Sequence, residues 1–407
     1  MTDQTTFSID EVLTRGVAEV LPSTEELKKA LQSRRLKLYL GIDPTGSLLT
    51  LGHSVVLRKL QQFAELGHEV ILLIGNGTVK IGDPTGRDST RPELTNEKII
   101  ENFQTWKEQA SKVLDFSKIE IKYNGDWLDK LTYSDIVKLM AKTTVQQLLE
   151  RDMFQERMSK NLPIHGHEIM YPLLQGYDSV VMDVDLEIGG TDQTFNMMMG
   201  RSLQKQYHNK EKWVLTTPII NGTDGRKMSK SYDNFIALTE NPIDMYGKLM
   251  SIADSMVIEY FLVLTSVSSD EIETMQAAIG AGGNPMQFKK QLAFCITEMY
   301  HDTKAATSAQ EHFEKTVQNK ELPVDMPTVQ INQDLISLLE CVKLCMSEES
   351  SSNLRRLIMQ GAVEIFYSDH SSERPSDPQY VITITQPTKT VTHLRIGKRA
   401  YFALSLA

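Results

Sequence analysis

Apolar positions near the start of the chain occur first in short runs and then at helical spacing. Leu36–Gly41 is a short apolar run followed by the turn residues Asp43–Gly46, and the spacing of Val55–Phe63 predicts a helix that ends at Gly67. The run Val70–Ile74 predicts a second buried strand. A strand, a helix and a strand in succession indicate a βαβ unit and hence a parallel sheet.

Further along the chain the pattern alternates between helical and strand-like segments. Residues 1–35 are polar with helical spacing, and 96–156 is predicted to be a charged, largely helical insertion. Strands are expected at Val180–Ile188 and Trp213–Leu215, and helices from Ile243 to about Lys320. We therefore predict an α/β fold: a Rossmann-like domain with a doubly wound parallel sheet at 1–235, containing a helical insertion at about 96–165, then an α-helical domain at 236–330 and a small α+β module at 332–407.

Composition narrows the class of protein. Of the 407 residues, 41% are hydrophobic and 24% are charged, which is typical of a globular protein and excludes wholesale disorder. The net charge is −10, with 43 basic and 53 acidic residues, which argues against non-specific coating of nucleic acid but leaves room for a local basic face. Residues 332–407 are electrically neutral, which leaves all of the acidic excess in 1–331.

The N-terminal residues and the cysteines lead us to expect a cytoplasmic location. Met1–Gln4 contains neither a basic nor an apolar segment of the kind that directs export. The apolar runs are too short to span a bilayer. Three cysteines, Cys295, Cys341 and Cys345, form no disulfide framework, as expected in a reducing compartment.

A first candidate site lies between the first strand and its helix. Gly41, Asp43 and Thr45 follow the strand, and Gly52-His53 begins the helix. The N-terminus of a helix at the carboxyl end of a parallel strand suits a phosphate, because its free N–H groups and positive dipole end face the anion. The structural alternative is an ordinary capped helix start with a surface histidine.

A second candidate site is the loop Gly225–Ser231. Lys227 and Lys230 could clamp a polyphosphate, although a lysine-rich surface loop is the simpler explanation when the segment is considered alone. The two sites together, in this order, favour nucleotide chemistry. His165 and His167 lack further ligands at metal-binding spacing, so no metal held by the protein is expected.

The pentapeptide Lys227–Ser231 is the signature of class I aminoacyl-tRNA synthetases, and within that class the chain resembles the bacterial-type tyrosyl-tRNA synthetases. The resemblance runs from about residue 30 to the C-terminus. Its most specific stretches are Tyr171–Asp178 and Ile188–Gln193, and Ile81–Gly86 and Tyr123–Leu128 also match. One position departs from the family: residues 50–53 are Thr-Leu-Gly-His, where the family has His-Ile-Gly-His.

The resemblance implies a role for each matching residue. Catalytic roles fall to Thr45, His53, Lys227 and Lys230. The implied tyrosine-binding residues are Tyr39, Asp83, Tyr171, Gln175, Asp178 and Gln193. The implied ATP-binding residues are Gly41, Asp43, Thr45, Gly52, His53, Gly190, Asp192, Lys227, Met228 and Lys230.

These assignments agree with the chemistry of the substrate. An α-ammonium group offers only donors, so it needs acceptors such as Asp83, Tyr171 and Gln175. A phenol hydroxyl needs one acceptor and one donor, which Asp178 and Tyr39 supply. An indole offers only an N–H donor, so this pair distinguishes tyrosine from tryptophan, the substrate of the related class I enzymes.

The implied reaction joins tyrosine to the 3′-end of tRNA(Tyr) through a tyrosyl-adenylate, with ATP as a substrate that brings Mg²⁺. The implied assembly is a homodimer formed through the inserted region. Residues 332–407 resemble an S-four-type RNA-binding module, and its expected tRNA contacts are Arg355, Arg356, Arg395, Lys398 and Arg399. Because Thr50 replaces a motif histidine, a non-catalytic RNA-binding relative remains the alternative from another functional class.

Overall fold

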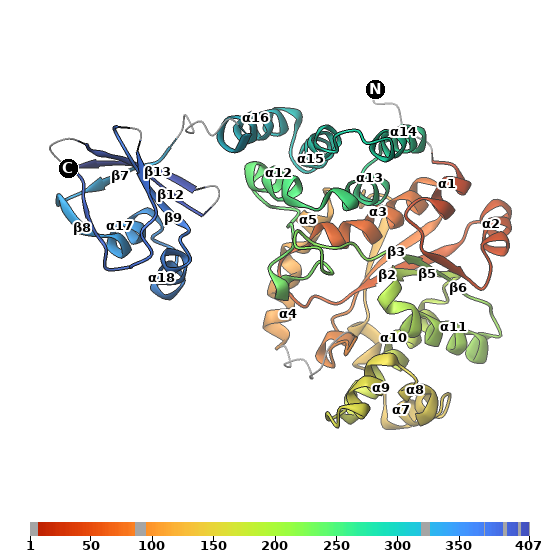
Figure 1. The fold of residues 1–407 in the computed structure, drawn as a ribbon. Helices are drawn as coiled ribbons and strands as arrows, with labels where there is room; N and C mark the ends of the chain where they lie inside the picture. Colours follow the sequence, from red (N-terminus) through yellow and green to blue (C-terminus); the bar gives the residue numbers. More distant parts are fainter. Residues whose placement is uncertain are drawn as a thin grey trace. The chain divides into compact units, whose positions relative to one another are not determined.

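The structure is a computed structural model, and it describes residues 7–85, 95–318, 326–369, 371–385, 389–397 and 400–406. The chain divides into two compact units, residues 1–307 and 308–407 (Figure 1). Among the helices that are described, none is long and apolar enough to cross a membrane.

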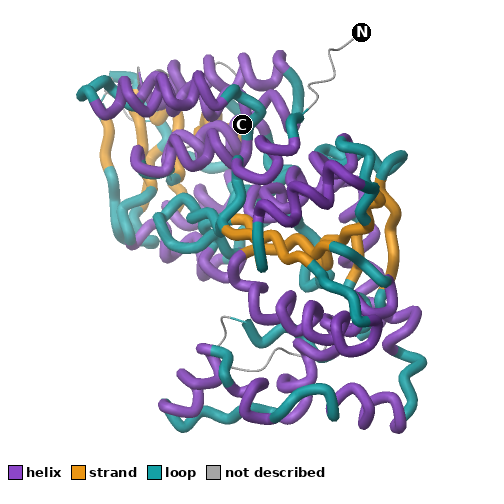
Figure 2. Tube along the Cα trace, turned by 90° about the vertical axis from the view of Figure 1, so that its right-hand side faces the viewer, coloured by secondary structure: helices purple, strands orange, loops and turns teal. Residues whose placement is uncertain are grey.

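The first unit is built on a sheet whose described strands follow the order β1-β6-β5-β2-β3-β4. The strands from β6 to β4 run parallel, and β1 pairs antiparallel with β6. Residues of β3, β5 and β6 are almost all buried, because helices cover both faces of the sheet (Figure 2). The strands are β1 Glu19–Leu21, β2 Lys37–Ile42, β3 Glu69–Ile74, β4 Ile119–Tyr123, β5 Leu186–Gly190 and β6 Trp213–Thr217.

The helices around this sheet place the loops of the site. Helix α3 contacts β2, β3 and β5, while α10 packs along α11, which contacts β5 and β6. The helices up to the last sheet strand are α1 Ile9–Thr14, α2 Thr24–Ser33, α3 Leu51–Glu65, α4 Asn96–Gln104, α5 Trp106–Ala110, α6 Gly125–Leu128, α7 Tyr133–Met140, α8 Val145–Leu149, α9 Asp152–Ser159, α10 Gly166–Met182 and α11 Thr194–His208. Helices follow where they were predicted, as α12 Pro242–Ser251, α13 Val257–Leu264, α14 Ser269–Gly280, α15 Met286–Tyr300 and α16 Thr303–Phe313.

Three segments differ from the sequence prediction. The predicted strand Val180–Ile188 is wrong in its first half: α10 continues to Met182 and ends at Asp183, whose φ of 48° stops the helix. A short buried apolar run has the same appearance in a helix and in a strand. Strands β1 and β4 lie in ranges that were predicted to be helical. Strand β1 has only three residues, and in β4 the charged Glu120 and Lys122 alternate with apolar residues inside a charged stretch.

The second unit packs helices against small sheets. Its larger sheet has the order β10-β9-β12-β13-β7 in the described residues, and β11 pairs with β8. Leu354 and Ile358 of α18 are buried in a common core with Ile365 and Leu394 of the sheet. The elements are β7 Thr328–Ile331, β8 Leu335–Ser337, α17 Leu338–Cys345, α18 Ser351–Met359, β9 Val363–Tyr367, β10 Ser372–Glu373, β11 Val381–Thr383, β12 Val391–Ile396 and β13 Ala400–Leu406.

Candidate active site

The first unit contains a cavity of about 320 Å³ at the carboxyl ends of β2 and β5 and at the start of α3. Ligands bind at this edge of an open parallel sheet, because the strand ends and the helix N-terminus present loops and free N–H groups there. Every residue predicted to contact tyrosine or ATP lines the cavity except Lys230. The sequence predictions therefore meet at one place in the fold.

The start of α3 holds His53 in one orientation. Thr50 is the N-cap residue, and its backbone N–H donates to Nδ1 of His53 at 3.1 Å. The Thr50 hydroxyl lies 2.8 Å from the same nitrogen. Because Nδ1 accepts the backbone N–H, the ring proton of neutral His53 is on Nε2, which can donate to a ligand. Burial and the nearby Lys230 ammonium lower the pKa of His53 to about 4, so the ring is neutral at pH 7.

Asp43 joins two sides of the cavity. Its Oδ1 accepts from the Thr78 hydroxyl at 2.8 Å, and its Oδ2 accepts from the Tyr171 hydroxyl at 2.8 Å. A Cβ at Gly75 would lie 1.9 Å from Oδ1 of Asp43, so only glycine fits at that position. Because the Tyr171 hydroxyl donates its proton to Asp43, its oxygen can only accept a hydrogen bond from a ligand in the cavity.

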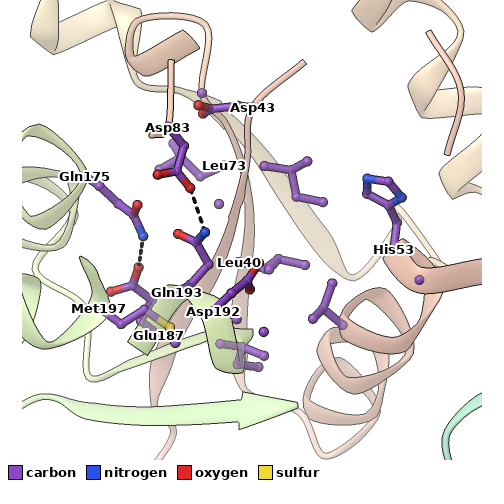
Figure 3. Close-up of a pocket in the computed structure, with 18 of the residues that line it drawn as sticks. Leu40, Asp43, His53, Leu73, Asp83, Gln175, Glu187, Asp192, Gln193 and Met197 are labelled. Atoms are coloured by element: carbon purple, nitrogen blue, oxygen red, sulfur yellow. Dashed lines mark hydrogen bonds between the residues drawn. The ribbon is translucent and has the colours of Figure 1, made fainter. Parts of the chain in front are cut away.

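Two glutamines have their amide nitrogens engaged by neighbouring carboxylates. Gln193 Nε2 donates to Oδ2 of Asp83 at 2.7 Å, and Gln175 Nε2 donates to Oε1 of Glu187 at 3.2 Å (Figure 3). The carbonyl oxygen of Gln175 is thereby directed to act as an acceptor. Asp83, Tyr171 and Gln175 all line the cavity and all have acceptor oxygens. His53 lies across the cavity from Gln175 and Glu187 (Figure 3).

Asp178 and Tyr39 are buried side chains in the wall of the same cavity. Asp178 accepts from Trp127 Nε1 at 2.8 Å and from Asn124 Nδ2 at 3.1 Å. Burial raises the pKa of Asp178 well above its usual range, and these two donors oppose the rise because they stabilise the carboxylate. The Tyr39 hydroxyl lies 3.0 Å from Oγ of Ser179.

The loop Lys227–Ser231 is held close to the start of α3. Lys227 Nζ pairs with Oδ2 of Asp192 at 2.9 Å, and Asn234 accepts from the backbone N–H of Ser229 at 2.8 Å. A Cβ at Gly46 would lie 3.1 Å from Nζ of Lys230, which puts this ammonium beside the loop that follows β2. The two candidate sites recognised in the sequence are therefore one site in the structure.

Comparison with known proteins identifies the family of the chain. Residues 31–318 match the family described as tRNA synthetases class I (W and Y). The chain is 43% identical over 397 residues to the tyrosine–tRNA ligase of Thermotoga maritima, covering 97% of this chain and 96% of that protein. The chain belongs to the class I tyrosyl-tRNA synthetases. A second relative, the tyrosine–tRNA ligase of Aquifex aeolicus, is 40% identical over 392 residues, covering 96% and 97% of the two chains.

Solved synthetase structures share the fold. The tyrosyl-tRNA synthetase of Archaeoglobus fulgidus complexed with L-tyrosine aligns with a TM-score of 0.61 at 21% identity, covering 74% of this chain and all (100%) of that one. A C-terminally truncated mitochondrial tyrosyl-tRNA synthetase of Aspergillus nidulans aligns with a TM-score of 0.64 at 20% identity, covering 77% and 94%. At these identities the likeness shows the fold alone.

Several residues of this synthetase site were missed by the sequence analysis. Asn124 and Trp127 fall inside a stretch that matches the family, and Glu187 lies two residues before Gly189-Gly190, so proximity to motifs could have pointed to them. Lys212, which pairs with Glu187, carries no motif at all. Its contact with Glu187 becomes visible only when the sheet brings β5 and β6 together.

The second unit of the synthetase presents part of its predicted RNA-binding set. Arg355 and Arg356 are exposed on α18. Arg395 on β12 pairs with Glu364 at 2.6 Å, so part of its charge is compensated. Lys398 and Arg399 lie outside the described residues.

Proposed function

We propose that this chain activates L-tyrosine with ATP to tyrosyl-adenylate and diphosphate, and then transfers tyrosine to the 3′-end of tRNA(Tyr) with release of AMP. The name shared by its curated relatives supports the reaction. The observation that carries the choice of amino acid is the pair of Tyr39 and Asp178, which offers a hydroxyl and a carboxylate in one cavity. A phenol hydroxyl satisfies both, whereas an indole N–H or a phenyl ring leaves at least one unpaired.

A second set of polar groups in the same cavity fits the ammonium of the substrate. Asp83 supplies negative charge. The Tyr171 oxygen is an acceptor because its proton is donated to Asp43, and the Gln175 carbonyl oxygen is an acceptor whose direction is set by the bond from its amide nitrogen to Glu187. Gln193 retains an N–H that can donate to the substrate carboxylate. This distribution would bind a zwitterionic amino acid in one direction only.

The first chemical step needs no protein base, because a carboxylate is already the nucleophile at pH 7. It requires in-line positioning and stabilisation of the charge that develops on the departing diphosphate. Thr45, His53, Lys227 and Lys230 would supply donors and cations for that charge. Mg²⁺ would arrive with ATP as part of the substrate.

Tyrosine-dependent exchange of diphosphate into ATP tests the reaction. Exchange should occur with tyrosine, and phenylalanine and tryptophan should support it poorly. Absence of exchange with tyrosine would overturn the proposal. Exchange with tryptophan alone would assign the chain to the other activity named in its family, and tRNA binding without any exchange would favour a non-catalytic relative.

We also propose that the chain forms a homodimer through α7 and α8. Tyr133, Val137 and Met140 recur at helical spacing on α7 and are 86%, 47% and 43% exposed, and Val145 of α8 is 59% exposed. Clustered exposed apolar side chains of this kind are typical of an interface. Val137→Asp should therefore yield a monomer in light scattering, while Val381→Asp in the second unit, also at an exposed valine, should leave a dimer.

A further inference from the structure

Lys212, Glu187 and Ser179 form a buried polar cluster next to the cavity. Lys212 precedes β6 and is 0% exposed, and its Nζ contacts the carboxylate of Glu187 on β5. The same nitrogen donates to Oγ of Ser179 on α10 at 2.8 Å and to the backbone carbonyl of Met197 on α11 at 3.1 Å. These three acceptors use all three N–H groups of an ammonium, so the lysine is satisfied as a cation.

The fold makes room for this cluster at one glycine. A Cβ at Gly200 of α11 would lie 2.5 Å from Nζ of Lys212 and 2.7 Å from Oγ of Ser179, so a larger residue would displace both groups. A buried ion pair adds little net stability, because removing two charges from water costs about as much as their attraction returns. Stability alone therefore gives no reason for the cluster, and its contacts with cavity residues suggest a role there.

One contact of the cluster reaches the ammonium end of the cavity. Glu187 accepts from Nε2 of Gln175 at 3.2 Å (Figure 3), which fixes the direction of that amide and leaves its oxygen as an acceptor. Lys212 neutralises Glu187, so the carboxylate can be buried there without an unpaired charge.

The other contact reaches Tyr39. An ammonium can only donate, so Ser179 Oγ must accept from Lys212 and keeps its own proton. That proton has two possible acceptors, Oη of Tyr39 at 3.0 Å and Oε2 of Glu187 at 3.4 Å. The shorter contact favours Tyr39. Burial, the charge of Glu187 and a hydrogen bond to that carboxylate raise the pKa of Tyr39 well above its usual range, so its hydroxyl remains protonated. A substrate phenol would replace Glu187 as the acceptor of that proton.

We propose that Lys212 and Ser179 are positioning residues that make Tyr39 the hydrogen-bond donor to the phenol of the substrate. Hydrogen bonds would then run in one direction, from Lys212 through Ser179 and Tyr39 to the phenol and on to the Asp178 carboxylate. Each oxygen between the cation and the carboxylate accepts one proton and donates one. Phenylalanine would interrupt this sequence and leave the Tyr39 donor and Asp178 unpaired. This inference rests on the proposed activation of tyrosine.

The test compares tyrosine with phenylalanine in the ATP–diphosphate exchange assay, using the full-length protein. Ser179→Ala removes the link between Lys212 and Tyr39 without introducing a new group. We expect the ratio of kcat/KM for tyrosine over phenylalanine to fall by about tenfold or more, through a loss for tyrosine alone. Thr297→Val, which removes another fully buried hydroxyl in α15, should keep the wild-type ratio.

The outcomes separate this inference from the proposed function. If wild-type protein shows no tyrosine-dependent exchange, the proposed function fails and the inference fails with it. If wild-type protein is active but Ser179→Ala keeps the ratio, or lowers both substrates equally, Ser179 is only structural and the inference is overturned.

A second variant covers the case in which Ser179→Ala does not fold. Lys212→Met with Glu187→Gln removes both charges together at similar volume, so no buried charge is left unpaired. The same ratio is measured, with the same expected fall. An unchanged ratio in this double variant would equally overturn the inference.

Discussion

At the scale of single residues, Asp178 is the side chain that we expect to contribute most to the selection of tyrosine. It is 1% exposed and holds two donors, Asn124 and Trp127, that fix the direction of its oxygens. A group fixed in this way can accept from a phenol without rearranging, which is the property that selective recognition requires.

Asp178→Asn should reduce discrimination against phenylalanine. The asparagine amide would replace one acceptor oxygen by an N–H group, although Asn124, Trp127 and the substrate phenol all donate to this position. The phenol would therefore lose its carboxylate acceptor. We expect kcat/KM for tyrosine to fall roughly ten- to hundredfold more than that for phenylalanine in exchange assays. Asp183→Asn, at the exposed end of the same helix, is the matched control and should behave as wild type. If the ratio of kcat/KM for tyrosine over phenylalanine is unchanged in Asp178→Asn, Asp178 does not recognise the phenol hydroxyl of the substrate.

His53 should make stability depend on pH in a defined window. Its pKa is about 4 in the folded chain and about 6.5 when unfolded, so between these values only the unfolded chain binds the proton. The free energy of unfolding should therefore decrease as the pH falls from about 6.5 toward 4. Between pH 7.5 and pH 5 the free energy of unfolding of the wild type should decrease, and His53 should account for at most about 2 kcal/mol of that decrease. In His53→Asn this part of the decrease should be absent. Urea unfolding at pH 7.5 and pH 5 measures these free energies. An identical pH dependence in the wild type and in His53→Asn would contradict the prediction.

At the scale of elements, the loop Lys227–Ser231 lies beside the start of α3, so two lysines and the neutral His53 ring are available to the same proposed phosphate group. Lys227→Ala and Lys230→Ala should each lower kcat for adenylate formation by about 10²-fold, because charge on the diphosphate develops in the transition state. The Kd for tyrosine should stay near the wild-type value, since neither lysine contacts the proposed amino-acid end. Pre-steady-state adenylate formation and equilibrium dialysis separate the two quantities.

Lys205→Ala is the control for the loss of a lysine. Lys205 pairs with Glu211 on the surface and is 51% exposed, so its removal should leave both quantities unchanged. A loop variant that lost tyrosine affinity while keeping its activation rate would contradict the assignment.

The elements also show what sequence can and cannot predict. Strands β2 and β3 and helix α3 were predictable because a buried parallel strand and an amphipathic helix have different apolar periods. The same signal could not show where α10 ends, since Val180 and Met182 are buried in a helix and resemble a strand. The candidate site was predictable where a family motif covers it. Lys212 was not, because its partner Glu187 is 25 residues away and only the pairing of β5 with β6 brings them together.

At the scale of the whole molecule, the two units should divide the reaction between them. All the proposed tyrosine and ATP contacts lie in residues 1–307, whereas the neutral segment 332–407 exposes Arg355 and Arg356. A chain cut after about residue 325 should keep most of its adenylate formation and lose most of its transfer to tRNA. Exchange and tRNA-charging assays on the same preparation measure both.

Salt dependence provides the accompanying check. Arg355→Ala with Arg356→Ala should weaken tRNA binding. The slope of log K against log salt should become shallower by the amount that corresponds to the loss of up to about two phosphate contacts. Normal charging by the truncated chain, or an unchanged slope in the double variant, would show that the second unit is not the RNA-binding part.

Asp43 accepts hydrogen bonds from both Thr78 and Tyr171, and this arrangement bears on how the two substrates affect each other's binding. If tyrosine binds beside Tyr171 and ATP beside Asp43, as proposed, a shift of Tyr171 on binding would also move the Asp43 carboxylate, and occupancy at one end would then alter affinity at the other. Such coupling is reciprocal: the factor by which tyrosine strengthens ATP binding equals the factor by which ATP strengthens tyrosine binding. Either substrate could then enter first without changing the final stability of the ternary complex. If the coupling is favourable, each substrate would lower the concentration of the other that is needed to form the ternary complex.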